Sequence, residues 1–316
     1  MVVKSLFEKA KNHVDVFVRA GIGFADDRAT KMSAALAFTT IFSLPPMLLL
    51  IIIAGGTFLG DQAVSGELFG QLRGFVGDDS ALQIQSAISK INFHKNNTIA
   101  TIISAVVLVI GATSIFVEIQ DSLNMIWGVR AKAKKGFIKI LLSRLLSFTM
   151  ILIIGFLLLV SLLLNTIILT LSNFIISKFP FVPVDLIDML NSIFVFVVLV
   201  SLFMLLFKLL PDVKIKWGQV LPGSLVTTLL FLLGKYLIGL YIGSSTISTL
   251  YGAAGSVIIL LLWIYYSSFI LYYGAEYTKA YLEVFNKGEI LPNSISEFAD
   301  KALIKQYDKE KKNGVR

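Results

Sequence analysis

The chain has no cysteine, only two histidines and few charged side chains. Without cysteine it forms no disulfide, binds no metal through thiolates and has no thiol nucleophile. Charged residues make up 15% of the 316 residues, whereas a soluble domain carries about 25%. The apolar residues, 56% of the chain, come in long runs, and the mean hydropathy is +0.82. These features predict an integral membrane protein.

Six of the apolar runs are long enough to cross a bilayer as helices, which takes roughly 20 residues each. They cover approximately residues 34–58, 98–116, 145–169, 190–210, 218–242 and 252–276. The sequence therefore predicts an all-α, polytopic membrane protein with six transmembrane helices. Its expected parts are a cytoplasmic or interfacial amphipathic segment at 1–33, a membrane domain at 34–281 and a basic cytoplasmic tail at 282–316.

The basic residues fall mostly on alternate connections between these runs. Of the 28 lysines and arginines, 23 border one predicted side of the membrane and four border the other. Because basic residues accumulate on the cytoplasmic side, we expect both termini to be cytoplasmic. The net charge of +8 follows from this bias and from attraction to anionic headgroups, so we expect no nucleic-acid partner. The lysine-rich tail after Pro292 is predicted to be solvated.

Motifs of hydrolytic and metal-dependent enzymes are missing from the sequence. It contains no HExxH, no GxSxG and no carboxylate cluster with metal-ligand spacing. His13 and His94 fall on opposite predicted sides of the membrane, so they cannot share a site. We therefore expect no enzymatic activity, no catalytic residue, no metal and no cofactor.

Amphipathic helices are predicted in the connections between the spans. Residues 1–33 place Val14 on an apolar stripe suited to a helix in the inner interface. In the connection after the first span, Ile84 and Ile88 predict the apolar face of a short surface helix. The second span is expected to continue beyond the membrane as a helix, with Asn124 lying off its apolar face.

The first span contains two consecutive prolines, Pro45 and Pro46. Neither proline donates a backbone N–H, so the helix is predicted to kink or break and to free backbone carbonyls. Those carbonyls need new partners. A lined cavity provides them, and so does local hydrogen bonding by Thr39, Thr40 or Ser43; the sequence leaves both open.

Near the estimated midplanes of the six spans the sequence has no ionisable side chain. Ion-coupled transporters usually place such groups there, so we do not expect a proton-coupled pump for small polar solutes. Lys235 lies close enough to the outer end of its span to extend outward. Thr227 and Thr228 in the fifth span, and Tyr265 and Tyr266 in the sixth, either hold helices together or line the path of an amphiphile's headgroup.

The last span is predicted to begin near Tyr251 and Gly252 on the outside and to end at Glu276 on the inside. Gly252 and Ser256 form a small-xxx-small pair, which suits close helix packing or a hinge. Glu276 either pairs with Lys279 at the interface or acts at the inner mouth of a cavity.

Four stretches of the chain carry a resemblance to a known family. They are AALAFTTIFSLPPMLL (34–49), EIQDSLNMIWGV (118–129), LLPDVKIKWGQVLPGSLVTTLLFLLGKYLIGLYI (209–242) and YGAAGSVIILLLWIYYSSFILYYGAEYTKAY (251–281). Together they resemble the YihY/virulence factor BrkB family of bacterial inner-membrane proteins, once labelled ribonuclease BN-like. The resemblance implies a multi-pass protein of the bacterial inner membrane. Members have been linked to envelope functions that include lipid transport and serum resistance, whereas the ribonuclease label gains no support from this chain.

We expect a transporter-like membrane protein that handles an amphiphile or an envelope lipid, with membrane lipids as its surroundings. A non-transporting scaffold for envelope partners is the alternative, and a membrane enzyme is a more distant one. The residues predicted to form a cavity or gate are Thr39, Thr40, Ser43, Pro45, Pro46, Gln120, Asp121, Asn124, Thr227, Thr228, Lys235, Tyr251, Gly252, Tyr265, Tyr266 and Glu276.

Overall fold

The chain folds into a helical bundle, seen in a computed structural model. The structure describes residues 2–76, 78–89, 98–131, 141–142, 144–155, 184–244, 253–285, 291–293 and 296–299. Its helices are α1 (Val2–Asp26), α2 (Ala29–Leu59), α3 (Asp61–Val76), α4 (Asp78–Ser89), α5 (Thr98–Ile126), Arg144–Gly155, α7 (Val184–Leu209), α8 (Trp217–Ser244) and α10 (Ala253–Val284). Its strands are β1 (Val129–Ala131), β2 (Val213–Lys214), β3 (Leu291–Pro292) and β4 (Ser296–Phe298).

Within the described residues, five helices are long and apolar enough to cross a membrane: α2, α5, α7, α8 and α10. They coincide with five of the six predicted spans, and the all-α polytopic fold is confirmed. The third predicted span is described as far as Gly155, in the shorter apolar helix Arg144–Gly155. The count of six spans and the placement of the termini stay predictions.

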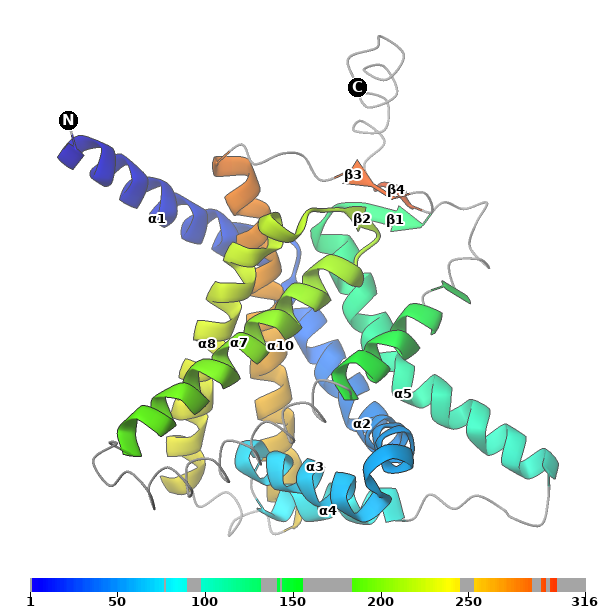
Figure 1. Ribbon diagram of the computed structural model, residues 1–316. Helices are drawn as coiled ribbons and strands as arrows, with labels where there is room; N and C mark the ends of the chain where they lie inside the picture. Colours follow the sequence, from blue (N-terminus) through cyan, green and yellow to red (C-terminus); the bar gives the residue numbers. More distant parts are fainter. Residues whose placement is uncertain are drawn as a thin grey trace.

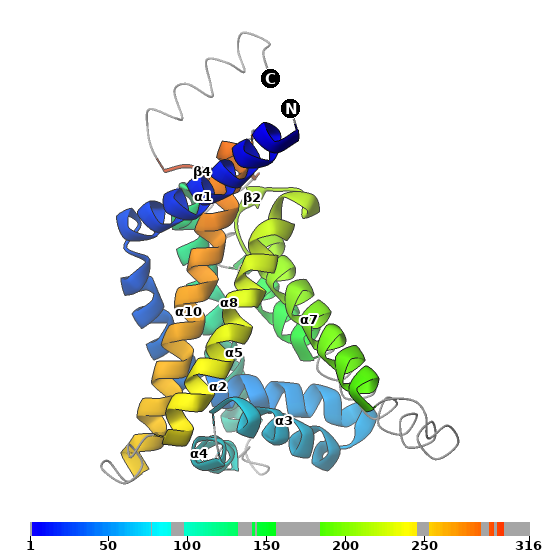
Figure 2. The same ribbon diagram turned by 90° about the vertical axis from the view of Figure 1, so that its left-hand side faces the viewer.

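The long helices converge at one end of the bundle and spread apart toward the other (Figures 1 and 2). The end where they converge carries the four strands and α1, and we call it the strand end. At the opposite end α3 and α4 lie across the bundle (Figure 1), and we call it the α3–α4 end. The antiparallel pairs β1–β4 and β2–β3 join the segment after α10 to the ends of α5 and α7.

Helix α2 runs without interruption through Pro45 and Pro46, so the helix does not break there. Thr40 Oγ1 donates a hydrogen bond to the Leu36 carbonyl, 2.7 Å away. On α5, Gly111 faces Pro46, and a Cβ added at Gly111 would lie 3.2 Å from Pro46 Cγ. The glycine therefore lets the two helices approach where the proline ring projects.

Helices α8 and α10 interlock through two reciprocal glycine–threonine pairs. Gly223 of α8 faces Thr278 of α10, and Gly274 of α10 faces Thr227 of α8. Each threonine hydroxyl donates to the carbonyl of the glycine on its own helix, at 2.7 Å for Thr227 and 2.8 Å for Thr278. The small residues thus bring the two helix backbones close together, as expected of helix contacts in membranes.

Helix α1 packs lengthwise on α10 at the strand end. Val16 and Ala20 are buried against Tyr277 and Ala280, while Val14 on the opposite side of α1 is 62% exposed. The turn between α1 and α2 contains a residue in the left-handed region, Arg28, at φ 53°. An outward apolar face beside a buried one suits a helix lying in the membrane interface.

At the α3–α4 end, the connection between the first two spans holds two helices. The predicted surface helix is present as α4, and Ile84 and Ile88 are buried under it. The sequence analysis missed the other helix, α3, which follows Gly60 at φ 85°. Its glycines, Gly66 and Gly70, hid the helical pattern.

Candidate functional site

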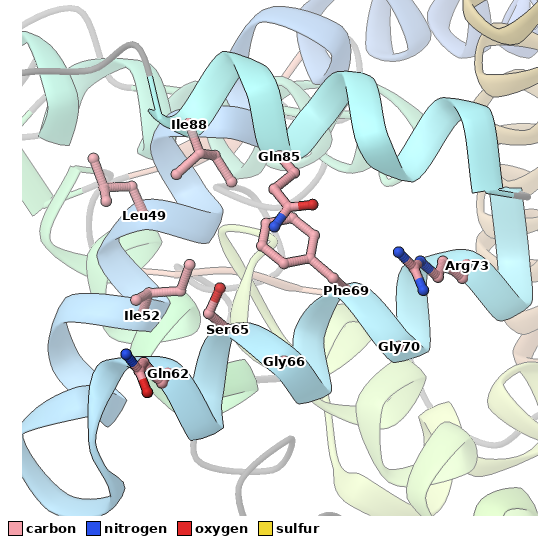
Figure 3. A pocket seen from close by; sticks show the side chains of 10 residues that line it. All are labelled: Leu49, Ile52, Gln62, Ser65, Gly66, Phe69, Gly70, Arg73, Gln85 and Ile88. Atoms are coloured by element: carbon pink, nitrogen blue, oxygen red, sulfur yellow. The ribbon is translucent and has the colours of Figure 1, made fainter.

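A cavity of about 580 Å³ lies between α2, α3 and α4 at the α3–α4 end. We call it the α3 cavity. Most of its lining comes from α3, with further residues from α2 and α4 (Figure 3). The lining residues are Leu49, Ile52, Gln62, Ser65, Gly66, Phe69, Gly70, Arg73, Gln85 and Ile88. Ligand cavities typically have about 300–1,000 Å³, so this one is large enough to hold a small molecule or part of a lipid.

Two glycines of α3 create much of the space. Gly66 and Gly70 both line the cavity, and a Cβ added at either would meet nothing within 4 Å. Glycine costs a helix interior about 1 kcal/mol relative to alanine. Because no neighbouring helix packs against Gly66 or Gly70, the lack of side chains at these positions leaves open volume.

The lining mixes polar and apolar side chains, and its charged side chain lies at one end. Arg73 lies at one end of the row of lining side chains, and Leu49 and Ile52 lie toward the other (Figure 3). Phe69 extends from α3 toward Gln85 of α4 in the same view. Arg73 Nε also lies 3.4 Å from Asp78 Oδ1, and this exposed ion pair joins the end of α3 to the start of α4. In such a cavity, the polar part of an amphiphile can contact Arg73 and its apolar part can contact Leu49 and Ile52.

A second polar cluster, buried at the strand end, surrounds Asp212. Its carboxylate accepts hydrogen bonds from Gln120 Nε2 at 3.2 Å and Asn124 Nδ2 at 2.9 Å. The Asp212 backbone N–H donates to Asn124 Oδ1 at 2.7 Å. Asn124 was expected off the apolar face of α5 and is instead buried, because a buried carboxylate requires donors. Gln120 and Asn124 therefore position the connection after α7.

The segment after α10 completes this cluster. Ser296 Oγ and the Asn293 N–H donate to the Asp212 carbonyl at 2.6 and 3.1 Å. The sequence analysis expected the chain beyond Pro292 to be solvated, which is wrong for Asn293 and Ser296. Strand pairing and the Asp212 carbonyl hold these residues against the bundle.

The predicted hydroxyl residues of α8 and α10 bond mainly to helix backbones. Thr227 and Thr228 are fully buried and donate to the carbonyls of Gly223 and Ser224. The Tyr266 hydroxyl crosses to α8 and donates to the Leu230 carbonyl at 3.1 Å. Gly234 lies directly against the Tyr266 ring. These residues hold α8 and α10 together.

Glu276 is buried at the strand end, with 2% of its surface exposed. Lys279 Nζ lies 4.0 Å from Glu276 Oε2 and 3.6 Å from Asp27 Oδ2. The predicted pairing with Lys279 is present. The second carboxylate comes from the turn between α1 and α2, so the lysine links that turn to α10.

The remaining predicted residues are spread over the bundle. Ser43 is buried in α2 and Thr39 half-buried, while Asp121 and Lys235 are exposed and Tyr265 is half-buried. Tyr251 and Gly252 lie outside the described residues. None of the predicted residues that the structure describes lines the α3 cavity. In the same described part of the chain, no three His, Asp or Glu side chains lie close enough to hold a metal ion.

Sequence reasoning missed the residues of the α3 cavity and Asp212. In the connection after the first span, the sequence predicted the surface helix of Ile84 and Ile88 but not α3. Glutamines spaced along an amphipathic helix are ordinary surface residues, and only a second helix above them encloses a cavity. For Asp212, its place in the Leu-Pro-Asp sequence after a span was the only local signal.

The fold and the cavity define a class: a polytopic helical membrane protein with a lined cavity at one end of its bundle. Residues 22–294 match the family model described as Virulence factor BrkB, and the chain belongs to that family.

The chain is also similar to individual bacterial membrane proteins. A "UPF0761 membrane protein" of Verminephrobacter eiseniae is 28% identical over 266 residues, which are 82% of this chain and 60% of the relative. A protein of the same name from Azotobacter vinelandii is 29% identical over 256 residues, 80% of this chain and 60% of the relative. The chain thus spans about 60% of the length of these relatives. No solved structure matches it.

Proposed function

We propose that this protein binds a membrane amphiphile in the α3 cavity and moves it between the membrane and the space outside the α3–α4 end. The observation that carries the proposal is a mixed lining with the charged Arg73 at one end and the apolar Leu49 and Ile52 toward the other. A lipid has the same division, since its charged headgroup and its acyl chains need different surroundings. We infer binding and movement rather than catalysis.

We further propose that the cavity opens on the side of the inner membrane away from the cytoplasm. The uneven distribution of basic residues supports this orientation, because the strand end receives the connections that carry most of them. Lys214 and Lys216, both exposed or partly exposed near β2, belong to that end. Three further lysines assigned to the same side, Lys132, Lys134 and Lys135, lie outside the described residues.

The proposal is tested by filling the cavity. Gly66→Leu and Gly70→Leu add side chains at two lining positions where a Cβ meets nothing within 4 Å, so they should reduce the open volume. The matched control is Gly218→Leu in α8, where an added Cβ also meets nothing within 4 Å. Each purified protein is reconstituted into vesicles with fluorescent phospholipids of several headgroups, and lipid movement between leaflets is followed by quenching from outside.

We expect the wild-type protein and Gly218→Leu to accelerate lipid movement, and Gly66→Leu and Gly70→Leu to abolish most of the acceleration. If the wild-type protein matches empty vesicles for every headgroup, transport is refuted. A partner that then co-purifies in a fixed ratio would favour the scaffold instead. If the filled variants move lipid as fast as wild type, the α3 cavity is not the site.

A further inference from the structure

One cation lies against the middle of α5, a helix long and apolar enough to cross a membrane. Arg144 begins the helix Arg144–Gly155, and its guanidinium contacts the α5 residues Ile110, Thr113 and Ser114. These three residues fall near the middle of α5, beside Gly111, which faces Pro46 in the middle of α2.

Only one nitrogen of Arg144 makes these contacts. Nη1 donates to the Ile110 carbonyl at 3.1 Å and to Thr113 Oγ1 at 2.9 Å, and lies 3.5 Å from Ser114 Oγ. A guanidinium has five N–H donors arranged as a planar fork. Among the described residues, no acceptor is within reach of Nε or Nη2. That edge of the fork has the geometry that binds phosphate through two parallel hydrogen bonds.

The surroundings of Arg144 face lipid. Ile110 and Val107 on α5 are exposed, and so is Leu145 next to the arginine. In a membrane-spanning chain, exposed apolar side chains at this depth contact acyl chains. Ionisable groups there are rare and usually functional, since they need a partner that water does not supply.

Carboxylates follow on the same side of α5, one and two turns closer to the strand end. Ile110, Ser114, Glu118 and Asp121 recur at the spacing of one helical face. Glu118 is half-buried and Asp121 is exposed. One helical turn advances about 5.4 Å, so a positive group at the level of Ser114 precedes negative groups along a short stripe. In a zwitterionic headgroup a negative phosphate is followed outward by a positive ammonium. Each charge of such a headgroup would therefore face an opposite charge on this stripe.

We propose that Arg144, Ser114 and Glu118 form a site on the lipid-facing side of α5 for a zwitterionic headgroup, with the phosphate on the arginine and the ammonium on the glutamate. The headgroup belongs to a membrane phospholipid drawn below its usual depth. This site is on a different part of the bundle from the α3 cavity, and it holds a lipid whether or not the protein transports one.

The test compares two lipids that share acyl chains and phosphate but differ in the ammonium, phosphatidylethanolamine and phosphatidylglycerol. Each is titrated against purified full-length protein in detergent, and bound lipid is counted by native mass spectrometry. We expect the wild-type protein to prefer phosphatidylethanolamine. Arg144→Gln should raise the concentration needed for half-saturation about tenfold for both lipids, the effect of losing about one charge-assisted hydrogen bond. Glu118→Gln should remove the preference and leave phosphatidylglycerol binding intact.

Matched controls come from an ion pair at the strand end. Arg130 Nε and Glu297 Oε1 lie 3.1 Å apart and are partly exposed, so Arg130→Gln and Glu297→Gln remove the same charges elsewhere. Both controls should bind the two lipids as the wild type does. Soluble phosphoethanolamine in excess should compete only weakly, because a lipid also contacts the apolar side chains.

Three results would overturn the proposal. The first is equal binding of the two lipids by the wild-type protein. The second is Glu118→Gln with an unchanged preference. If Arg144→Gln lowers the unfolding temperature but binds lipid as the wild type does, Arg144 only ties two helices together, and the site is likewise refuted. If that variant does not fold, Glu118→Gln alone decides the outcome, since its side chain lies on the outer side of α5.

Discussion

Gly23 of α1 lies directly against the carboxyl group of Glu276 on α10. A Cβ added at Gly23 would sit 2.5 Å from Glu276 Oε2 and 3.0 Å from Cδ. The same carboxylate neighbours Lys279, which also reaches Asp27 in the turn after α1. The glycine therefore sets how closely α1 approaches α10, and the ion pairs hold the turn in place.

Gly23→Ala should destabilise the protein by about 1–2 kcal/mol, because the added methyl displaces a buried carboxylate. Gly21→Ala is the matched control, since a Cβ at that position meets nothing within 4 Å. It should be neutral or slightly stabilising, because alanine favours helix more than glycine does. Thermal unfolding in detergent measures both. Equal behaviour of the two variants would show that Gly23 does not set the approach of α1.

Gly274→Ala should destabilise more than Gly23→Ala does. Its new methyl would meet the Thr227 hydroxyl, which is fully buried and hydrogen-bonded on α8, whereas the Glu276 carboxylate ends a flexible side chain. Adding Thr227→Ala should recover part of the loss, so the two changes should be less than additive. Gly155→Ala is the control, because its Cβ would lie 3.6 Å from Ile51, an ordinary contact. Strict additivity of the double variant would contradict the interlocking of α8 and α10.

Ser296→Ala should loosen the segment after α10. It removes the hydrogen bond from Ser296 Oγ to the buried Asp212 carbonyl, which contributes about 1 kcal/mol. We expect faster proteolysis of the C-terminal segment in the purified protein. Glu297→Ala removes only a partly exposed ion pair with Arg130 and should change the rate little. If Ser296→Ala speeds proteolysis no more than Glu297→Ala does, strand pairing holds the segment without help from the Ser296 hydroxyl.

The absence of cysteine makes the proposed orientation directly measurable, since every introduced thiol is the only one. Leu82→Cys lies exposed on α4, and Lys216→Cys and Lys11→Cys lie exposed at the strand end. In intact cells, an impermeant maleimide should label Leu82→Cys only. After permeabilisation it should label all three. Labelling of Lys216→Cys and Lys11→Cys in intact cells would reverse the orientation.

The long helices could be predicted from the sequence because each depends on its own run of apolar residues. The extension of α5 to Ile126 and the burial of Ile84 and Ile88 under α4 likewise follow local periodicity. These features need no knowledge of distant residues.

The features that could not be predicted from the sequence depend on contacts between residues far apart in the chain. Asn124 looked like a solvated residue because its partner, Asp212, stands 88 residues away. Strand β1 pairs with β4 across 167 residues between Arg130 and Glu297, and strands this short have no signal of their own.

The Asp212 cluster also fixes an order of events during synthesis. Asn124 has already left the ribosome when Asp212 is made, but Ser296 follows 84 residues later. At about 5–20 residues per second, this interval lasts roughly 4–17 s. Throughout it the Asp212 carbonyl lacks the donors that Asn293 and Ser296 supply from the segment after α10. An mRNA truncated before the codon for Ser296 would yield a polypeptide in which this cluster stays incomplete. Proteases that degrade incomplete membrane proteins would then have access to it.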